Sequence, residues 1–233
     1  MNGRLKKYVR KVIYNVLTLF MDREKLIFLL ANDEEKTLLG FKRGGYLYDI
    51  GWTKSIITGN VTDASNNPLP WVTYPFIEFI AQRLTHTMDV FEFGSGNSTL
   101  YYAGRAASVY SVENDRLWFD KIKNTMPENV KLFYCELEDG GDYCKYAEKT
   151  DKKYDLVIVD GRDRVNCCIN GIAALKPAGV IMLDDAERKE YNKGINFLGN
   201  NGFKRLDFWG TAPTINYLKC TTLFYKTNNC LGI

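Results

Sequence analysis

Ten residues near the middle of the 233-residue chain decide its fold. They read Val90-Phe91-Glu92-Phe93-Gly94-Ser95-Gly96-Asn97-Ser98-Thr99. The apolar run is typical of a strand buried in a sheet, and the Gly-x-Gly turn after it lets backbone N–H groups approach a ligand closely. The stretch therefore predicts a strand, a ligand-binding turn and a helix in succession.

The chain from residue 71 onward alternates in the same way. We expect strands over residues 88–93, 108–113, 130–135, 154–160, 179–183, 203–209 and 220–226. We expect helices over residues 71–84, 98–106, 115–126, 141–149, 164–176 and 187–200. This alternation predicts a doubly wound sheet with right-handed crossovers, and the helix-free segment 210–219 predicts that the last strand runs antiparallel.

Acidic residues follow the predicted strands, at the edge where an open α/β sheet binds its ligand. Glu92 lies two residues before the first glycine, where a carboxylate would repel a pyrophosphate but suits a ligand that carries an ammonium group. Glu113 ends the second strand and can accept hydrogen bonds from both hydroxyls of a ribose. A carboxylate among Glu136, Glu138 and Asp139, after the third strand, could meet an adenine amino group.

The segment Glu92-Phe93-Gly94-Ser95-Gly96, followed by Glu113 and Asp160, resembles the class I S-adenosylmethionine-dependent methyltransferases. The resemblance covers about residues 71–226. It implies a Rossmann-like, seven-stranded sheet of order 3-2-1-4-5-7-6, with strand 7 antiparallel and helices on both faces. It also implies S-adenosylmethionine as the cofactor and a methyltransferase activity.

The resemblance assigns roles to individual residues as well. The expected cofactor contacts are Tyr74, Glu92, Gly94, Ser95, Gly96, Asn97, Ser98, Glu113, Glu138 and Asp160. Asp160 and Asp184 are the expected catalytic residues, because a hydroxyl acceptor needs a nearby base. Asp160, Asp184 and Asp185 would repel one another, so we expect Arg162 or Arg164, rather than a divalent ion such as Mg²⁺, to balance them.

Composition and charge narrow the class of protein further. The net charge of +3 is too balanced for a dedicated nucleic-acid binder. The cysteines show no CxxC spacing and His86 is the only histidine, which argues against a zinc site. Scattered cysteines fit a reducing compartment, so the sequence predicts a cytoplasmic location.

Residues 1–70 are expected to form a helical and irregular extension that shapes the acceptor pocket or a dimer contact, ahead of a methyltransferase domain at 71–233. Within residues 1–21, five basic residues and no acid accompany apolar residues at helical spacing. The basic residues are Arg4, Lys6, Lys7, Arg10 and Lys11, and the apolar ones are Val9, Val12, Ile13, Val16 and Phe20. We expect this amphipathic helix to pack on the domain; peripheral contact with an anionic membrane or a homodimer interface are the alternatives.

Three classes of function are compatible with these observations. The first is methylation, at oxygen, of a small-molecule or glycan-type acceptor. The second is a non-catalytic nucleotide-binding or membrane-associated protein on the same fold. The third is an NAD(P)-dependent oxidoreductase, against which Glu92 argues, as does Thr99 in place of the third glycine of the dinucleotide fingerprint.

Overall fold

The computed structural model describes residues 3–19, 21–42 and 44–233 and divides into two compact units, Met1–Thr53 and Lys54–Ile233. We expected the boundary near residue 70, but residues 54–70 fold with the second unit. Thr62 forms a β-bridge with Pro68, and the side-chain amide of Asn97 donates a hydrogen bond of 2.8 Å to the carbonyl oxygen of Val61. Among the described residues, no helix is both long enough and apolar enough to cross a membrane.

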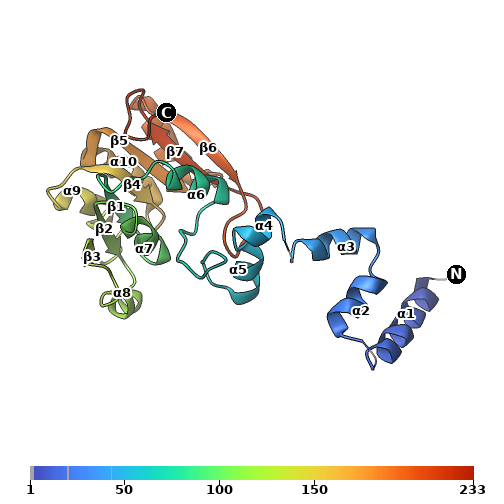
Figure 1. Ribbon diagram of the computed structural model, residues 1–233. Helices are drawn as coiled ribbons and strands as arrows, with labels where there is room; N and C mark the ends of the chain where they lie inside the picture. Colours follow the sequence, from blue (N-terminus) through green and yellow to red (C-terminus); the bar gives the residue numbers. More distant parts are fainter. Residues whose placement is uncertain (1–2, 20, 43) are drawn as a thin grey trace. The chain divides into compact units, whose positions relative to one another are not determined.

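The second unit is built on seven strands in the order β3-β2-β1-β4-β5-β7-β6 (Figure 1). The strands are β1 (Asp89–Phe93), β2 (Ser108–Glu113), β3 (Val130–Tyr134), β4 (Tyr154–Val159), β5 (Leu175–Asp184), β6 (Lys204–Gly210) and β7 (Lys219–Tyr225). Strands β1 to β5 pair in parallel, and β7 pairs antiparallel with both β5 and β6. The predicted topology is therefore confirmed.

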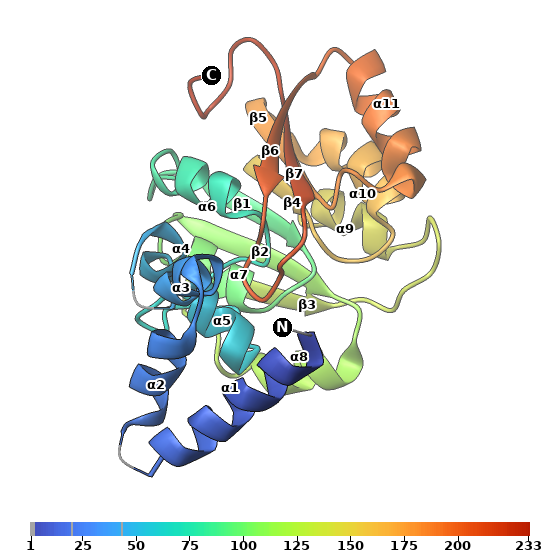
Figure 2. The same ribbon diagram turned by 90° about the vertical axis from the view of Figure 1, so that its right-hand side faces the viewer.

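Helices connect the strands and cover both faces of the sheet (Figure 2). They are α6 (Tyr74–Ala81), α7 (Asn97–Ala103), α8 (Arg116–Ile122), α9 (Tyr146–Lys149), α10 (Arg164–Gly171) and α11 (Asn192–Asn200), with short 3-10 turns at Tyr143–Lys145, Ile172–Ala174 and Lys189–Tyr191. The predicted helix over 164–176 was too long, since β5 already begins at Leu175. Pro177 explains why the helix cannot continue to residue 176, because a proline sterically disfavours the helical conformation of the residue before it.

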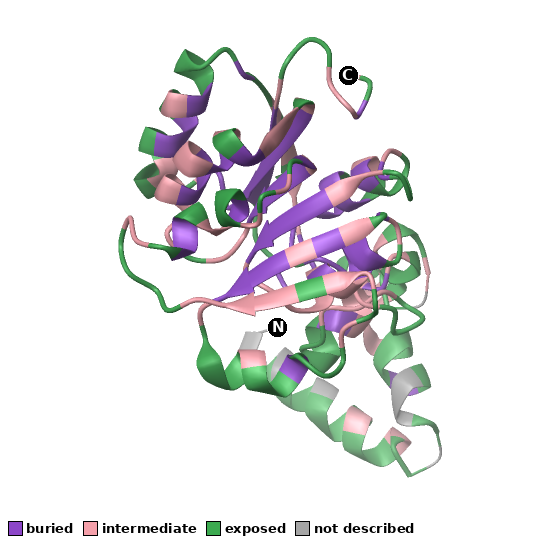
Figure 3. Cartoon of the chain, turned by 90° about the vertical axis from the view of Figure 1, so that its left-hand side faces the viewer, coloured by how far each residue is buried: buried purple, intermediate pink, exposed green. Residues whose placement is uncertain are grey.

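The alternation of side chains along β1 positions the site. Phe91 and Phe93 are fully buried and join the main apolar core together with Cys168 of α10 and Leu198 of α11. Figure 3 shows the central strands as the most buried part of this unit. Because neighbouring residues of a strand point to opposite faces, Glu92 turns toward the face covered by α7.

The first unit consists of short helices. They are α1 (Gly3–Leu17), α2 (Arg23–Leu30), α3 (Asp33–Gly40) and α4 (Tyr46–Asp49), followed by α5 (Trp52–Thr58) across the division. A capping box starts α3, because the Asn32 side chain accepts from the backbone of Glu35, whose carboxylate accepts from the Asn32 backbone. The predicted N-terminal helix is confirmed, although Phe20 and the side chains of Arg4, Lys6, Lys7 and Arg10 lie outside what the structure describes.

Candidate active site

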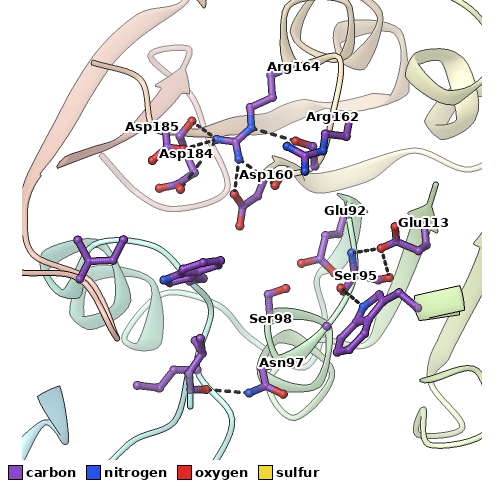
Figure 4. Close-up of a pocket in the computed structure, with 18 of the residues that line it drawn as sticks. Glu92, Ser95, Asn97, Ser98, Glu113, Asp160, Arg162, Arg164, Asp184 and Asp185 are labelled. Carbon is purple, nitrogen blue, oxygen red and sulfur yellow. Dashed lines mark hydrogen bonds and ion pairs between the residues drawn. The ribbon is translucent and has the colours of Figure 1, made fainter. Parts of the chain in front are cut away.

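A cavity of about 740 Å³ lies at the carboxyl ends of β1, β2, β4 and β5. Figure 4 shows acidic and basic side chains from these strand ends around one space. Among the predicted site residues, those lining the cavity are Glu92, Gly94, Ser95, Gly96, Asn97, Ser98, Glu113, Asp160 and Asp184. The edge of the sheet thus gathers the side chains that the sequence places after separate strands.

Tyr74 and Glu138 do not line this cavity. Tyr74 opens α6 and is buried in the protein interior. Glu138 is exposed on the loop after β3, where its carbonyl oxygen closes a turn with the N–H of Gly141. The adenine contact at Glu138 therefore stays a prediction, since this residue is outside the lining of the described cavity.

The backbone of the Gly94 turn lies against the turn after β4. Gly94 has a φ of +94°, and a Cβ atom built there would come within 3.0 Å of the Cα of Gly161. A Cβ on Gly161 would in turn overlap the hydroxyl of Tyr143 and approach the nitrogen of Gly94 within 2.8 Å. Both positions therefore require glycine, because the two turns pack backbone to backbone.

Glu92 is a buried carboxylate with one occupied oxygen. Its Oε2 accepts hydrogen bonds from Thr99 Oγ1 at 2.5 Å and from Ser111 Oγ at 3.3 Å. Its Oε1 is buried and has no hydrogen-bond donor within bonding geometry among the described residues. Burial raises the pKa of Glu92 to about 7, although the hydroxyls of Ser98, Thr99 and Ser111 favour the charged form.

Thr99 links this carboxylate to the glycine turn. Its hydroxyl accepts from the backbone N–H of Gly96 at 3.0 Å and donates to Glu92. The residue that occupies the third fingerprint position therefore holds the turn and orients the acid. The sequence showed only that a glycine was absent there, and this positioning role became visible once both partners were placed.

Glu113 organises the opposite wall of the cavity. Its Oε2 accepts from the backbone and the hydroxyl of Ser95 at 3.2 and 2.8 Å. Its Oε1 accepts from the backbone N–H groups of Asn114 and Asp115, each at 2.8 Å. The carboxylate thereby joins the tip of β2 to the glycine turn, as Figure 4 shows for Ser95.

Three cations balance the aspartates at the ends of β4 and β5, and one of them, Arg188, contacts Asp185 at 2.7 Å. Arg164 donates to Asp160 at 3.0 Å and to Asp185 at 3.3 Å, which agrees with the expected arginine counter-charge. The buried Lys219 contacts Asp184 at 2.5 Å and Asp185 at 2.8 Å. The sequence analysis did not identify Lys219 as a counter-charge. The available signal was a lysine at the first position of the apolar strand β7.

The electrostatic environments of these aspartates differ. Burial, reinforced by the charge of Asp184, raises the pKa of Asp160 well above its usual range. Burial likewise raises the pKa of Asp184 despite Lys219. Burial also acts on Asp185, but hydrogen bonding and charge from Lys219 outweigh it and lower the pKa of Asp185.

Asp160 and Asp184 also differ in access to the cavity. Asp184 is buried, and its two oxygens accept from Lys219 and from Thr221 Oγ1, the latter at 2.7 Å. Asp160 accepts a side-chain hydrogen bond from Arg164 at Oδ1, and no described side chain donates to its second oxygen, Oδ2. Figure 4 shows its carboxylate directed toward the space beside Glu92.

Aromatic side chains that the sequence did not single out as contacts complete the lining. Trp118 of α8 lines the cavity, and its indole N–H donates to the carbonyl oxygen of Ser95 at 2.9 Å. Trp71 and Tyr217 line it from other segments and are about half exposed. His86 is exposed and does not line this cavity, and among the described residues no group of three His, Cys, Asp or Glu side chains could hold a metal ion.

No protein-family model and no curated protein matches the chain. Among solved structures, a candidate O-methyltransferase from Klebsiella pneumoniae is similar, with 15% identity and a TM-score of 0.50, over 82% of this chain and 94% of that one. A precorrin-6y C5,15-methyltransferase from Geobacter metallireducens has 15% identity and a TM-score of 0.48, over 65% and 88% of the two chains. A candidate methyltransferase from Streptococcus mutans, solved with S-adenosylhomocysteine, has 12% identity and a TM-score of 0.47, over 64% and 94%. The Klebsiella likeness and the strand order show that the chain has the class I methyltransferase fold.

Proposed function

We propose that this protein is an S-adenosylmethionine-dependent methyltransferase. The observation that carries the proposal is the buried oxygen Oε1 of Glu92, which receives no hydrogen bond from any described residue although it lies beside the cavity. A buried polar atom without a partner costs free energy, and an ammonium group placed there would remove that cost. A dinucleotide, which brings a pyrophosphate to this turn, would not.

The residues present fit the remaining parts of this cofactor. The Ser98 hydroxyl lies at the same side of the cavity as Glu92. Glu113 lines the cavity at the end of β2, where the ribose is expected, and the exposed part of Trp118 offers an aromatic surface to an adenine. When bound, S-adenosylmethionine supplies a methyl group on a positively charged sulfur, so the protein mainly has to orient the acceptor.

Asp160 is the better candidate of the two predicted bases. A base must reach the proton that it removes, and Asp160 has one oxygen that accepts no hydrogen bond from a described side chain. Its raised pKa increases its affinity for an acceptor proton near neutral pH. Asp184, with both oxygens engaged, acts instead as the anchor that holds Lys219 and Thr221 in place.

The acceptor is a small molecule or glycan that is methylated at oxygen. The cavity volume is in the range of about 300–1,000 Å³ that holds small ligands. The half-exposed faces of Trp71 and Tyr217 give it apolar walls suited to a ring-shaped acceptor. The position of Asp160 favours a hydroxyl over an amine, because an alcohol must lose its proton as it is methylated.

Calorimetry with S-adenosylhomocysteine and with NAD, followed by transfer of a labelled methyl group to a cell extract, tests this function. We expect binding of S-adenosylhomocysteine alone and label in a small-molecule or glycan fraction. Asp160→Asn should keep the binding and lose the transfer, whereas Asp151→Asn, at an exposed turn residue after α9, should change neither. Binding of NAD alone, or binding without any transfer, would favour the oxidoreductase or the non-catalytic class.

A further inference from the structure

Helix α1 has an apolar face that the described residues of its own unit leave open. Val9, Val12, Ile13 and Val16 share this face at helical spacing, and each remains between 41% and 52% exposed. The helix packs beside α2 through a different side, on which Tyr14 is half-buried. Figure 3 shows most of α1 as exposed. The side of α1 that makes the intramolecular contact is therefore not its main apolar face.

The rest of the unit also exposes apolar side chains. Further exposed apolar side chains are Leu5, Tyr8, Leu19, Ile27, Phe28, Leu29 and Leu38. Leu26 is the one apolar side chain of the unit that is fully buried among those described. A unit with so small a core and so much exposed apolar surface is typical of a segment that binds another partner through that surface.

The charge of the segment identifies what covers it. Residues 1–21 contain five basic residues and no acid, and Lys11, whose side chain is described, is exposed. Two copies of such a helix would repel each other, whereas an anionic surface would attract each of them. We propose that α1 lies in the interface of an anionic lipid bilayer, with its valine and isoleucine face among the headgroups and acyl chains and Lys11 near the lipid phosphates.

Sedimentation of the full chain with vesicles tests this inference. Phosphatidylcholine vesicles with about one-third phosphatidylserine should retain the protein, and pure phosphatidylcholine vesicles should not. Lys11→Glu should lower partitioning more than about tenfold, because each lysine near such a surface contributes about fivefold. Raising the salt to about 0.5 M should weaken binding, since it screens surface charges.

Val12→Ser with Ile13→Ser probes the apolar face. We expect this double variant to partition at least about tenfold more weakly than the wild type. Leu117→Ser, at a position of α8 that is 83% exposed, and Lys204→Gln, on exposed β6, are the matched controls and should bind normally. Unchanged thermal unfolding shows that each variant is folded.

Three results would overturn the inference. The first is no sedimentation of the wild type with anionic vesicles at low salt. The second is binding that depends on Lys11 but ignores Val12 and Ile13, which would indicate charge attraction without insertion. The third is a dimer, detected by light scattering without lipid, that the apolar double variant dissociates while vesicle binding is absent. Failure of these tests leaves the proposed methyl transfer untouched, because that is measured by cofactor binding and label transfer.

Discussion

The affinity for S-adenosylhomocysteine should depend on pH through Glu92. The pKa of this buried side chain is raised from 4.5 to about 7, so roughly half of the ligand-free molecules carry it protonated at neutral pH. Only the carboxylate attracts the ammonium group of the ligand. That ammonium group stays charged below pH 7, because α-amino groups lose their proton only at higher pH. Lowering the pH should therefore weaken binding through the protein rather than through the ligand.

The size of the effect follows from the ionised fraction. With a pKa of about 7, this fraction falls from about 0.5 at pH 7 to about 0.03 at pH 5.5, and the apparent Kd rises about fifteenfold. Binding at pH 7 should also release about half a proton, since the bound ammonium group holds Glu92 ionised. Calorimetry in buffers of different ionisation enthalpy measures both the affinity and the released proton.

Glu92→Gln isolates this contribution. We expect the variant to bind more than about tenfold more weakly at pH 7.5, because an amide attracts an ammonium group less than a carboxylate does. Its remaining affinity should lose the steep pH dependence that the wild type shows. Glu148→Gln, at an exposed residue of α9, should behave as the wild type. A wild-type Kd that is constant from about pH 5.5 to pH 7, or the same slope in Glu92→Gln, would refute the reasoning.

The same ionisation should affect the stability of the ligand-free protein. A pKa raised in the folded state means that protonated Glu92 favours folding. This contribution is fully present below pH 4.5, is lost as the pH rises through about 7, and amounts to about 3 kcal/mol. Urea unfolding should therefore show that Glu92→Gln gains stability relative to the wild type as the pH rises. If the difference in free energy of unfolding between the two proteins did not change with pH, the burial argument would be contradicted.

Three further predictions follow from the site. Lys219→Met should lower the free energy of unfolding by about 3–5 kcal/mol, because it leaves Asp184 buried without its closest cation, and a loss below about 1 kcal/mol in urea unfolding would contradict this. Glu113→Ala should weaken S-adenosylhomocysteine binding more than about tenfold, since its hydrogen bonds hold the turn that lines the cavity; an unchanged Kd in calorimetry would refute the assignment. Gly161→Ala should cost about 1–3 kcal/mol because its Cβ overlaps Tyr143, and a wild-type melting temperature would show that the turns can separate.

Much of the architecture could be predicted from local pattern. The run from Val90 to Phe93 and the turn at Gly94 marked a buried strand and a ligand-binding edge, because apolar continuity and glycine both reflect local backbone needs. The antiparallel β7 followed from the helix-free segment before it. The end of α10 was harder to predict from the sequence. The helix stops at Gly171, several residues before Pro177, whose extended backbone belongs to β5.

The sequence by itself determined the sheet, its ligand-binding edge and the acids that lie there, because strand periodicity and turn residues act over a few neighbouring positions. Only the tertiary structure decided how these acids differ. Among the described residues, Glu92 has an oxygen without a donor because Thr99 and Ser111 both bind its other oxygen, whereas Lys219 pairs with Asp184 and Arg164 binds one oxygen of Asp160. Such differences depend on burial and on partners distant in the chain, so they arise only when the strands have been assembled.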